Sequence, residues 1–298
     1  MNRLVSLATI CGWLILLIFS VLVADAVHAQ ASQERLVAVR AGGLLEVETG
    51  KLIGDAVVLI RGERIEAVGP QVRIPSGAEV IDLSDYVVLP GLIDAHTHVC
   101  IQPGYASLNP ILYKSIPYRT VEAVNAAKAT LEAGFTTIEH GFFLDDEALD
   151  MMVANGTFWV PTISVYIPDS PREAWSEVRK AIIDGHADTI RRAAEKGVKI
   201  AYGTDAGALP HGDNAIDFER MVTYGMTPLQ AVQSAMLTAA ELMQMDGDVG
   251  TLTPGAFADL IAVPANPLDD VNVLGDVRFV MKGGAVIKHV AAGTARQR

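Results

Sequence analysis

The sequence predicts an α/β protein in which an incomplete (β/α) barrel is joined to a small β-sandwich built from both chain ends. Two observations predict this fold. Short β-rich runs broken by glycine and proline occur at 35–92 and return after residue 258. Between them, strand-like and helix-like runs alternate, which is typical of a mostly parallel sheet. We expect the sandwich at 30–90 and 249–298 and the barrel at 91–248.

The elements follow from local patterns. Apolar runs bounded by turn residues predict the sandwich strands at 36–39, 56–60, 65–68, 79–83, 259–263, 277–281 and 285–287. The barrel strands are expected at 92–99, 135–138, 158–165 and 198–202. The helices are expected at 120–132, 147–155, 172–196, 215–224 and 228–243. Four βα units in about 155 residues fall short of a closed eight-strand barrel, which usually needs ~250 residues.

The first 29 residues predict a secretory signal peptide. Arg3 is followed by an almost wholly apolar run, and Val27 and Ala29 are the small residues that a signal peptidase reads. We therefore expect a secreted or periplasmic protein with no membrane attachment after cleavage. An uncleaved membrane anchor is the alternative, because the apolar run reaches the length of ~20 residues that spans a bilayer.

The net charge and the cysteine content argue against a nucleic-acid-binding protein and against a disulfide-stabilised one. The net charge of −12 argues against a nucleic-acid partner. Removal of the signal leaves Cys100 as the single cysteine, so no internal disulfide is expected. We interpret Cys100 as a buried thiol.

The strongest chemical signal lies at the predicted strand ends. His96 and His98 are two residues apart in one strand, so their imidazoles share a face. His140 follows the next barrel strand and Asp205 follows the last. Because chemistry in parallel α/β sheets gathers at the carboxyl ends of the strands, we expect these side chains to meet at a metal site.

These segments resemble the amidohydrolase superfamily. Residues 89–98 are similar to its first barrel strand, 138–141 to its sixth and 203–207 to its eighth. The resemblance is closest to the branch of imidazolonepropionase-like enzymes and Xaa-Pro dipeptidases. It implies a hydrolase of amide-type C–N bonds that uses a metal-activated water, with a dipeptide or a cyclic amide as substrate.

The resemblance also implies site residues and a loss. His96, His98, His140 and Asp205 would hold a divalent metal, with zinc expected, and Asp205 would carry the proton. Residues 131–138 resemble the second strand but run directly into the sixth. Strands three to five are therefore missing, and with them two ligands of the second metal, so one ion is expected.

This departure leaves two readings of function open. One is an active metal-dependent amidohydrolase. The alternative is a catalytically impaired, internally deleted remnant with weak or no metal binding. Unpaired strand edges predict little turnover from a monomer and make a homo-oligomer a possible assembly.

Three further side chains receive weaker assignments. Tyr166 and His211 follow barrel strands and are candidates for contact with the substrate. The alternative interpretation of Tyr166 is an aromatic side chain that packs against its neighbours. The alternative interpretation of His211 is a solvated loop residue. His186 lies in a polar helical run, and we expect it to be exposed.

Overall fold

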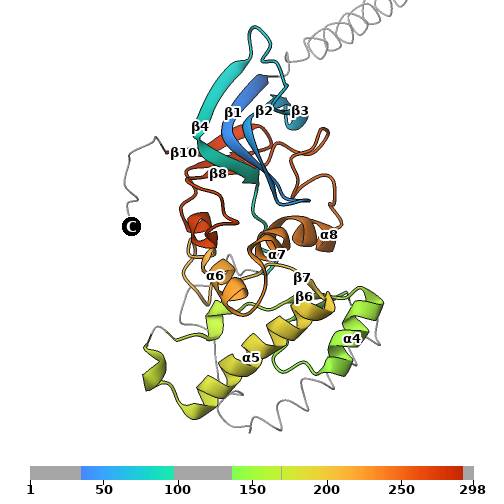
Figure 1. Cartoon of the computed structure of the whole chain (residues 1–298), viewed down its shortest axis with the longest axis vertical. Coiled ribbons are helices and arrows are strands. Elements are labelled where there is room, and N and C mark those ends of the chain that lie inside the picture. Colours follow the sequence, from blue (N-terminus) through green and yellow to red (C-terminus); the bar gives the residue numbers. More distant parts are fainter. Residues whose placement is uncertain (1–34, 97–135, 169, 291–298) are drawn as a thin grey trace, which may run out of the picture.

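The computed structural model describes residues 35–96, 136–168 and 170–290. It shows a β-rich end and a helix-rich end, joined through the centre of the molecule (Figure 1). The expected signal peptide, the expected helix at 120–132, His98 and Cys100 lie outside the described residues. None of the described helices is long and apolar enough to cross a membrane.

The β-rich end is one mixed sheet of seven strands. Its order is β10-β9-β8-β4-β1-β2-β3. Neighbouring strands are antiparallel except β1 and β4, which run parallel. The strands are β1 (Leu36–Glu46), β2 (Lys51–Arg61), β3 (Arg64–Gly69), β4 (Glu79–Pro90), β8 (Leu260–Val263), β9 (Phe279–Lys282) and β10 (Ala285–His289). Pairing of β4 with β8 therefore joins the two ends of the chain, as the sequence predicted.

This sheet curls around a core of its own. Val39, Val58, Leu83 and Phe279 come from four of its strands and are each almost fully buried in one cluster. The turn after β9 meets the turn after β2 so closely that a Cβ on Gly284 would lie 2.1 Å from a backbone oxygen. Glycine is required there because any side chain would collide with the facing turn.

The second sheet carries the strand ends on which chemistry was expected. It consists of β5 (Thr137–Glu139), β6 (Phe158–Val160) and β7 (Lys199–Ile200), all parallel. The α-helices α4 (Asp146–Asn155) and α5 (Glu177–Lys196) connect them. Within the described ranges this sheet has three strands, which fits the prediction of an incomplete barrel.

The prediction of a regular strand at 92–99 is wrong for its described part. Residues 92–96 form no regular strand, but their backbone follows the chain beyond β7. The Ala95 amide donates to the Tyr202 carbonyl at 2.8 Å, and the Asp205 amide donates to the His96 carbonyl at 2.7 Å. The pairing is interrupted because the Ile93 amide donates instead to the Ala235 carbonyl, in a helix.

That helix is continuous but changes its winding. It comprises α7 (Pro228–Gln233), a π-helical stretch (Ser234–Thr238) and α8 (Ala239–Leu242). Thr227 and Gln230 form a capping box at its start. The Ser234 carbonyl accepts a hydrogen bond from the Tyr202 amide. The π-helical stretch thus anchors both segments that lead to His96 and Asp205, in keeping with the frequent occurrence of π-turns at functional sites.

The other described helices lie at their expected positions, except that one expected helix is divided into two. α6 (Ile216–Thr223) lies where 215–224 was predicted. The helix expected at 172–196 is a short 3-10 turn (Arg172–Ala174) followed by α5. The break occurs because the Ser176 side chain caps the Arg179 amide and starts a new helix.

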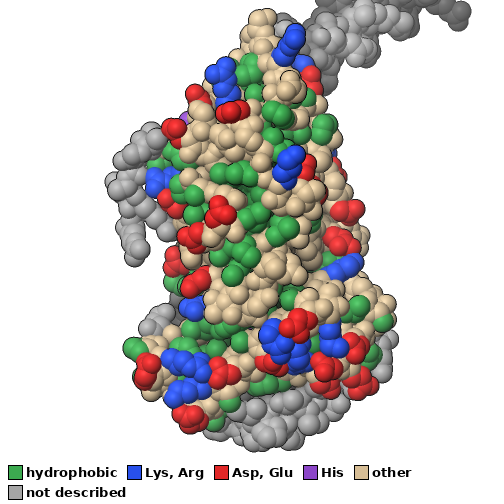
Figure 2. Space-filling view, in the orientation of Figure 1, with side chains coloured by type: hydrophobic (Ala, Val, Ile, Leu, Met, Phe, Trp, Pro, Cys, Tyr) green, Lys and Arg blue, Asp and Glu red, His purple; other side chains and the backbone are tan. Residues whose placement is uncertain are grey.

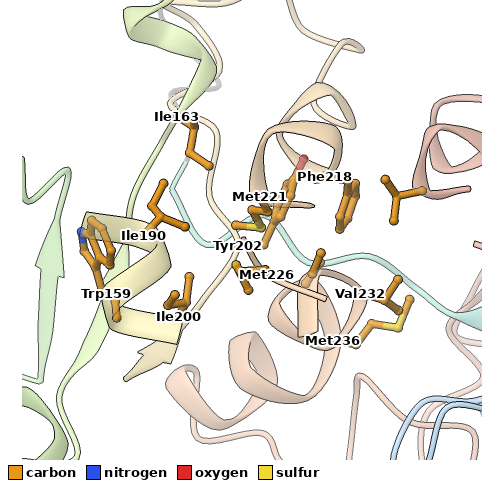
Figure 3. Packing of buried hydrophobic residues seen from close by; sticks show 14 of the residues in the cluster. Trp159, Ile163, Ile190, Ile200, Tyr202, Phe218, Met221, Met226, Val232 and Met236 are labelled. Atoms are coloured by element: carbon orange, nitrogen blue, oxygen red, sulfur yellow. The ribbon is translucent and has the colours of Figure 1, made fainter. Parts of the chain in front are cut away.

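One core lies between the β/α layer and the large sheet. Figure 3 shows side chains of this core lying one after another across the interior, from Trp159 through Ile190, Ile200 and Tyr202 to Phe218. The Tyr202 and Phe218 rings stack with centroids 4.2 Å apart. The same cluster continues to residues of β4 and β8 in the seven-stranded sheet. Packing therefore fixes the strand ends relative to the large sheet.

The prediction that His186 is exposed is wrong. His186 is 2% exposed, on the face of α5 that also buries Ile182, Ile190 and Ala193. Its ring lies 4.5 Å from the Phe142 ring. Burial lowers the pKa of His186 to about 3, so it is neutral at physiological pH. The polar residues that suggested exposure lie on the opposite face, where acidic and basic side chains intermingle (Figure 2).

Candidate metal centre

Three of the four predicted ligands come together. His96, His140 and Asp205 each offer a ligand atom, and these atoms all lie within 4.8 Å of one another. The His96 Nε2 lies 3.5 Å from Asp205 Oδ1. The two side chains are 19% and 16% exposed, so the group is shielded but open to solvent. Spacing of this kind suits a shared ion, because zinc binds nitrogen and oxygen at about 2 Å.

The strand ends place these side chains through unusual backbone angles. His140 directly follows β5 with a φ of 64°, and Asp205 follows β7 with a φ of 58°. Thr162, after β6, has a φ of 46°. Left-handed angles are uncommon for residues other than glycine. Each strand therefore turns sharply at its carboxyl end, where the polar side chains gather.

His96 is oriented by a carboxylate. Its Nδ1 lies 2.6 Å from Glu139 Oε2. This hydrogen bond raises the pKa of His96; partial burial opposes the rise, and the charges of Glu139, Asp205 and Asp94 add to it. With Nδ1 held by Glu139, Nε2 is the nitrogen that faces Asp205. A carboxylate behind the imidazole is the usual support of a metal-binding histidine.

His140 is held by two hydroxyl groups. Its Nδ1 lies 2.6 Å from Thr162 Oγ1 and 2.9 Å from the Tyr166 hydroxyl. The Trp159 indole donates to the His140 carbonyl at 3.0 Å. The rings of His96 and His140 meet edge to face, with centroids 5.1 Å apart. Both imidazoles are thus fixed in position by neighbours rather than by solvent.

A partly buried hydrogen-bond network holds the segment that precedes Asp205. The Asp94 carboxylate accepts hydrogen bonds from the Thr204 hydroxyl and the Asn214 amide, each at 2.6 Å. Gly203 permits the close packing, since a Cβ there would lie 2.3 Å from a Val160 methyl and 2.8 Å from the His96 Cβ. The chain before Asp205 is therefore locked against the His96 segment.

The remaining predicted residues separate into three cases. His98 lies outside the described residues, so its part in the site stays a prediction. Tyr166, at the end of a 3-10 helix (Ser164–Tyr166), contacts His140 and so belongs to the centre. His211 is exposed in a turn and is not part of the ligand group.

Several participants were not predicted. Glu139 and Asp94 stand inside the motifs that carry the resemblance, so their position beside histidines was a usable signal. Thr162 carried a weaker signal as the polar residue ending a strand. Asn214 comes from a loop after β7, and nothing in its local sequence indicated that it reaches Asp94.

A comparison with protein families decides the classification. A sequence model described as the amidohydrolase family matches residues 121–294. The chain belongs to the amidohydrolase family. Its mixed α/β fold is shared with amidohydrolases of known structure, which agrees with the resemblance seen in the sequence.

Curated relatives match only in part. Ochratoxinase from Aspergillus niger is 32% identical over 177 residues, covering 55% of this chain and 36% of that protein. Imidazolonepropionase from Cutibacterium acnes is 31% identical over 137 residues, covering 45% and 31%. The chain thus spans about a third of the length of these relatives.

Solved structures agree in fold. A Xaa-Pro dipeptidase with bound methionine in its active site superposes with a TM-score of 0.70 and 24% identity, over 85% of this chain and 100% of that one. The A. niger ochratoxinase structure gives 0.68 and 19%, over 86% and 96%. Identities this low support the shared architecture and no finer conclusion.

Proposed function

We propose that this chain is a metal-dependent hydrolase of amide-type C–N bonds, using one divalent ion, with zinc preferred. The observation that carries the proposal is the group of His96, His140 and Asp205 at the ends of neighbouring parallel segments. His98 joins the proposed ligand set from the sequence motif. Two imidazoles and a carboxylate are the donor types that zinc binds in catalytic sites.

The surroundings of the ligands support the same assignment. Each of the two described ligand histidines has its Nδ1 engaged, His96 by Glu139 and His140 by Thr162 and Tyr166. Such contacts fix the ring orientation and tautomer of a metal-binding histidine. A bound ion would lower the pKa of a coordinated water to about 7 and polarise the scissile carbonyl.

The chain's own residues supply the proton transfers. The Asp205 carboxylate is partly exposed at the centre of the group, where it is placed to accept a proton from the attacking water. It then delivers that proton to the leaving amine as the C–N bond breaks. The partly buried network of Asp94, Thr204 and Asn214 keeps the segment before Asp205 in place. The hydroxyl of Tyr166 lies beside His140, within reach of a substrate at the same edge.

We propose a dipeptide or a cyclic amide as the substrate. The dipeptide is supported by the resemblance of the sequence motifs to Xaa-Pro dipeptidases, and the cyclic amide by the name of a curated relative, imidazolonepropionase. The signal-like N-terminus supports export to the periplasm or the medium. We expect slow turnover from a monomer, because the sheet that carries the ligands has three strands within the described residues and catalysis is sensitive to displacements of ~1 Å.

The decisive experiment measures metal content and turnover together. We expect about one zinc per purified chain, as a single ligand group predicts, and loss of that zinc in His96→Ala. A panel of Xaa-Pro and other dipeptides with added zinc should show slow hydrolysis above the blank. That hydrolysis should be abolished by Asp205→Asn.

The opposite result has a definite meaning. A well-folded chain that binds no zinc and hydrolyses no member of the panel would refute the proposal. It would identify the chain as an impaired remnant of an amidohydrolase, which is the alternative left open by the shortened barrel.

A further inference from the structure

A separate cavity lies beyond the carboxyl end of β6. Its volume is about 630 Å³, within the usual range for small-molecule sites. The segment after β6 lines one side with Ile167 and Trp175, and Ile183 of α5 contributes to another. Arg220 and Tyr224, from the end of α6, complete the part of the wall that carries polar groups. His96, His140 and Asp205 are not among its lining residues.

Arg220 is the unusual member of this wall. Its Nε is buried and has no hydrogen-bond partner. Among the described residues, no carboxylate forms an ion pair with Arg220, although the chain carries a net charge of −12. A buried guanidinium nitrogen without an acceptor loses solvation without compensation. The two terminal nitrogens of the Arg220 guanidinium are not buried, so an anion in the cavity would pair with them rather than with Nε.

The second arginine of the cavity is already satisfied. Arg172 donates to both oxygens of Asp184, at 2.8 and 2.7 Å, and is exposed. Its guanidinium carbon also lies 5.6 Å from the Trp175 ring. Arg172 therefore shapes the rim, whereas Arg220 is the cation available to a ligand.

The rest of the wall defines the uncharged part of the ligand. Trp175 and Tyr224 present aromatic surface, and Ile167, Ile183 and Leu209 present aliphatic surface. The Trp175 indole nitrogen already donates to the Ser170 carbonyl, so this ring offers its apolar faces. An apolar group packed there, with one negative charge at Arg220, matches the chemistry of the cavity.

We propose that this cavity binds an aromatic or branched aliphatic monocarboxylate, whose carboxylate pairs with Arg220. The site is distinct from the ligand group of His96, His140 and Asp205 and does not require an ion. The 3-10 turn Ser164–Tyr166 adjoins both, because Ser164 and Ile167 line the cavity while the Tyr166 hydroxyl contacts His140. A carboxylate bound here would thus lie beside a turn that also contacts the metal centre.

Titration with phenylacetate tests the proposal on the full chain, freed of metal by a chelator. Binding should be saturable by calorimetry and should change tryptophan fluorescence. Of the three tryptophans, Trp13 lies in the expected signal, Trp159 is fully buried, and Trp175 lines the cavity. The fluorescence change should therefore disappear in Trp175→Phe.

Matched variants identify the cation. Arg220→Met should raise the Kd for phenylacetate about tenfold or more, as loss of a charge-assisted hydrogen bond predicts. Arg220→Lys should retain most of the affinity and keeps the test available if the methionine variant does not fold. Arg172→Met, which removes an exposed arginine already paired with Asp184, should change the Kd by less than about threefold. Neutral phenylacetamide should bind wild type and Arg220→Met equally.

Three results would overturn the inference. These are absence of saturable binding, equal affinity for phenylacetate and phenylacetamide, and loss of binding in Asp205→Asn. The last result would place the carboxylate at the metal centre instead. Retained binding in Asp205→Asn is expected, and it holds whether or not the chain proves to be a hydrolase.

Discussion

Asp217 offers the sharpest test of how the strand-end loop is held. It is fully buried in the first turn of α6. Its carboxylate accepts hydrogen bonds from the Ile163 and Ser164 amides, each at 2.9 Å. These amides directly follow Thr162, which contacts His140. Asp217 therefore fixes the segment that supplies both hydroxyl partners of His140.

Burial of this carboxylate changes its pKa. Burial raises the pKa of Asp217 from 3.8 to about 6, and the charge of Asp94 adds to the rise, while the hydrogen bonds to Ile163 and Ser164 oppose it. The folded protein therefore holds this proton over a range in which the unfolded chain has lost it. The resulting stabilisation is complete below about pH 4 and is lost as pH rises through about 6. A shift of about two units corresponds to ~3 kcal/mol.

Asp217→Asn removes the titration and keeps the shape. We expect the free energy of unfolding of wild type, minus that of the variant, to fall by about 3 kcal/mol between about pH 4 and pH 7. Urea unfolding followed by circular dichroism at constant ionic strength measures this difference. Glu219→Gln removes an exposed carboxylate from the same helix and serves as the control. A flat difference curve for Asp217→Asn would refute the reasoning.

Contacts elsewhere lead to four further expectations. Glu139→Gln should weaken zinc binding about 10- to 100-fold, measured by chelator competition, because it removes the carboxylate behind His96. Tyr166→Phe should weaken it by about tenfold or less in the same assay, since a second hydroxyl still contacts the His140 ring. Ser176→Ala should lower the free energy of unfolding by about 1 kcal/mol in urea, through loss of the cap on α5. N-terminal sequencing of the exported chain should begin immediately after Ala29; an intact N-terminus would favour the anchor.

The grouping of the ligands was predictable because it depends on topology. Alternating strands and helices imply a parallel sheet, and parallel strands bring their carboxyl ends to one edge. His140 and Asp205 follow such strands, so their proximity to His96 did not require a structure. The pairing of β4 with β8 was likewise implied by matching β-rich runs at both chain ends.

Most of the structural features that the sequence did not predict depend on contacts that local sequence does not encode. Asn214 reaches Asp94 across 120 residues of chain through the conformation of a loop. The irregular backbone at 92–96 results from competition by the Ala235 carbonyl for an amide that a regular strand would have used. His186 is a different case, since Ile182, His186 and Ile190 recur at four-residue intervals. That period predicts one buried helical face, and the charged residues between them concealed it.

The backbone angles at the strand ends connect the fold to the proposed chemistry. Six residues other than glycine have positive φ among those described, and His140, Thr162 and Asp205 are three of them. Such angles cost about 1–3 kcal/mol each and persist only where surrounding contacts hold them. Here the His140 amide donates to the Val160 carbonyl, and the Asp205 amide donates to the His96 carbonyl. Glycine would relieve the strain at His140 and Asp205 but would remove the ligand side chain. The need for that side chain therefore explains why a residue other than glycine occupies each of these positions. The three turns therefore favour a site selected for its chemistry, and the hydrogen bonds between neighbouring segments are what make that geometry stable.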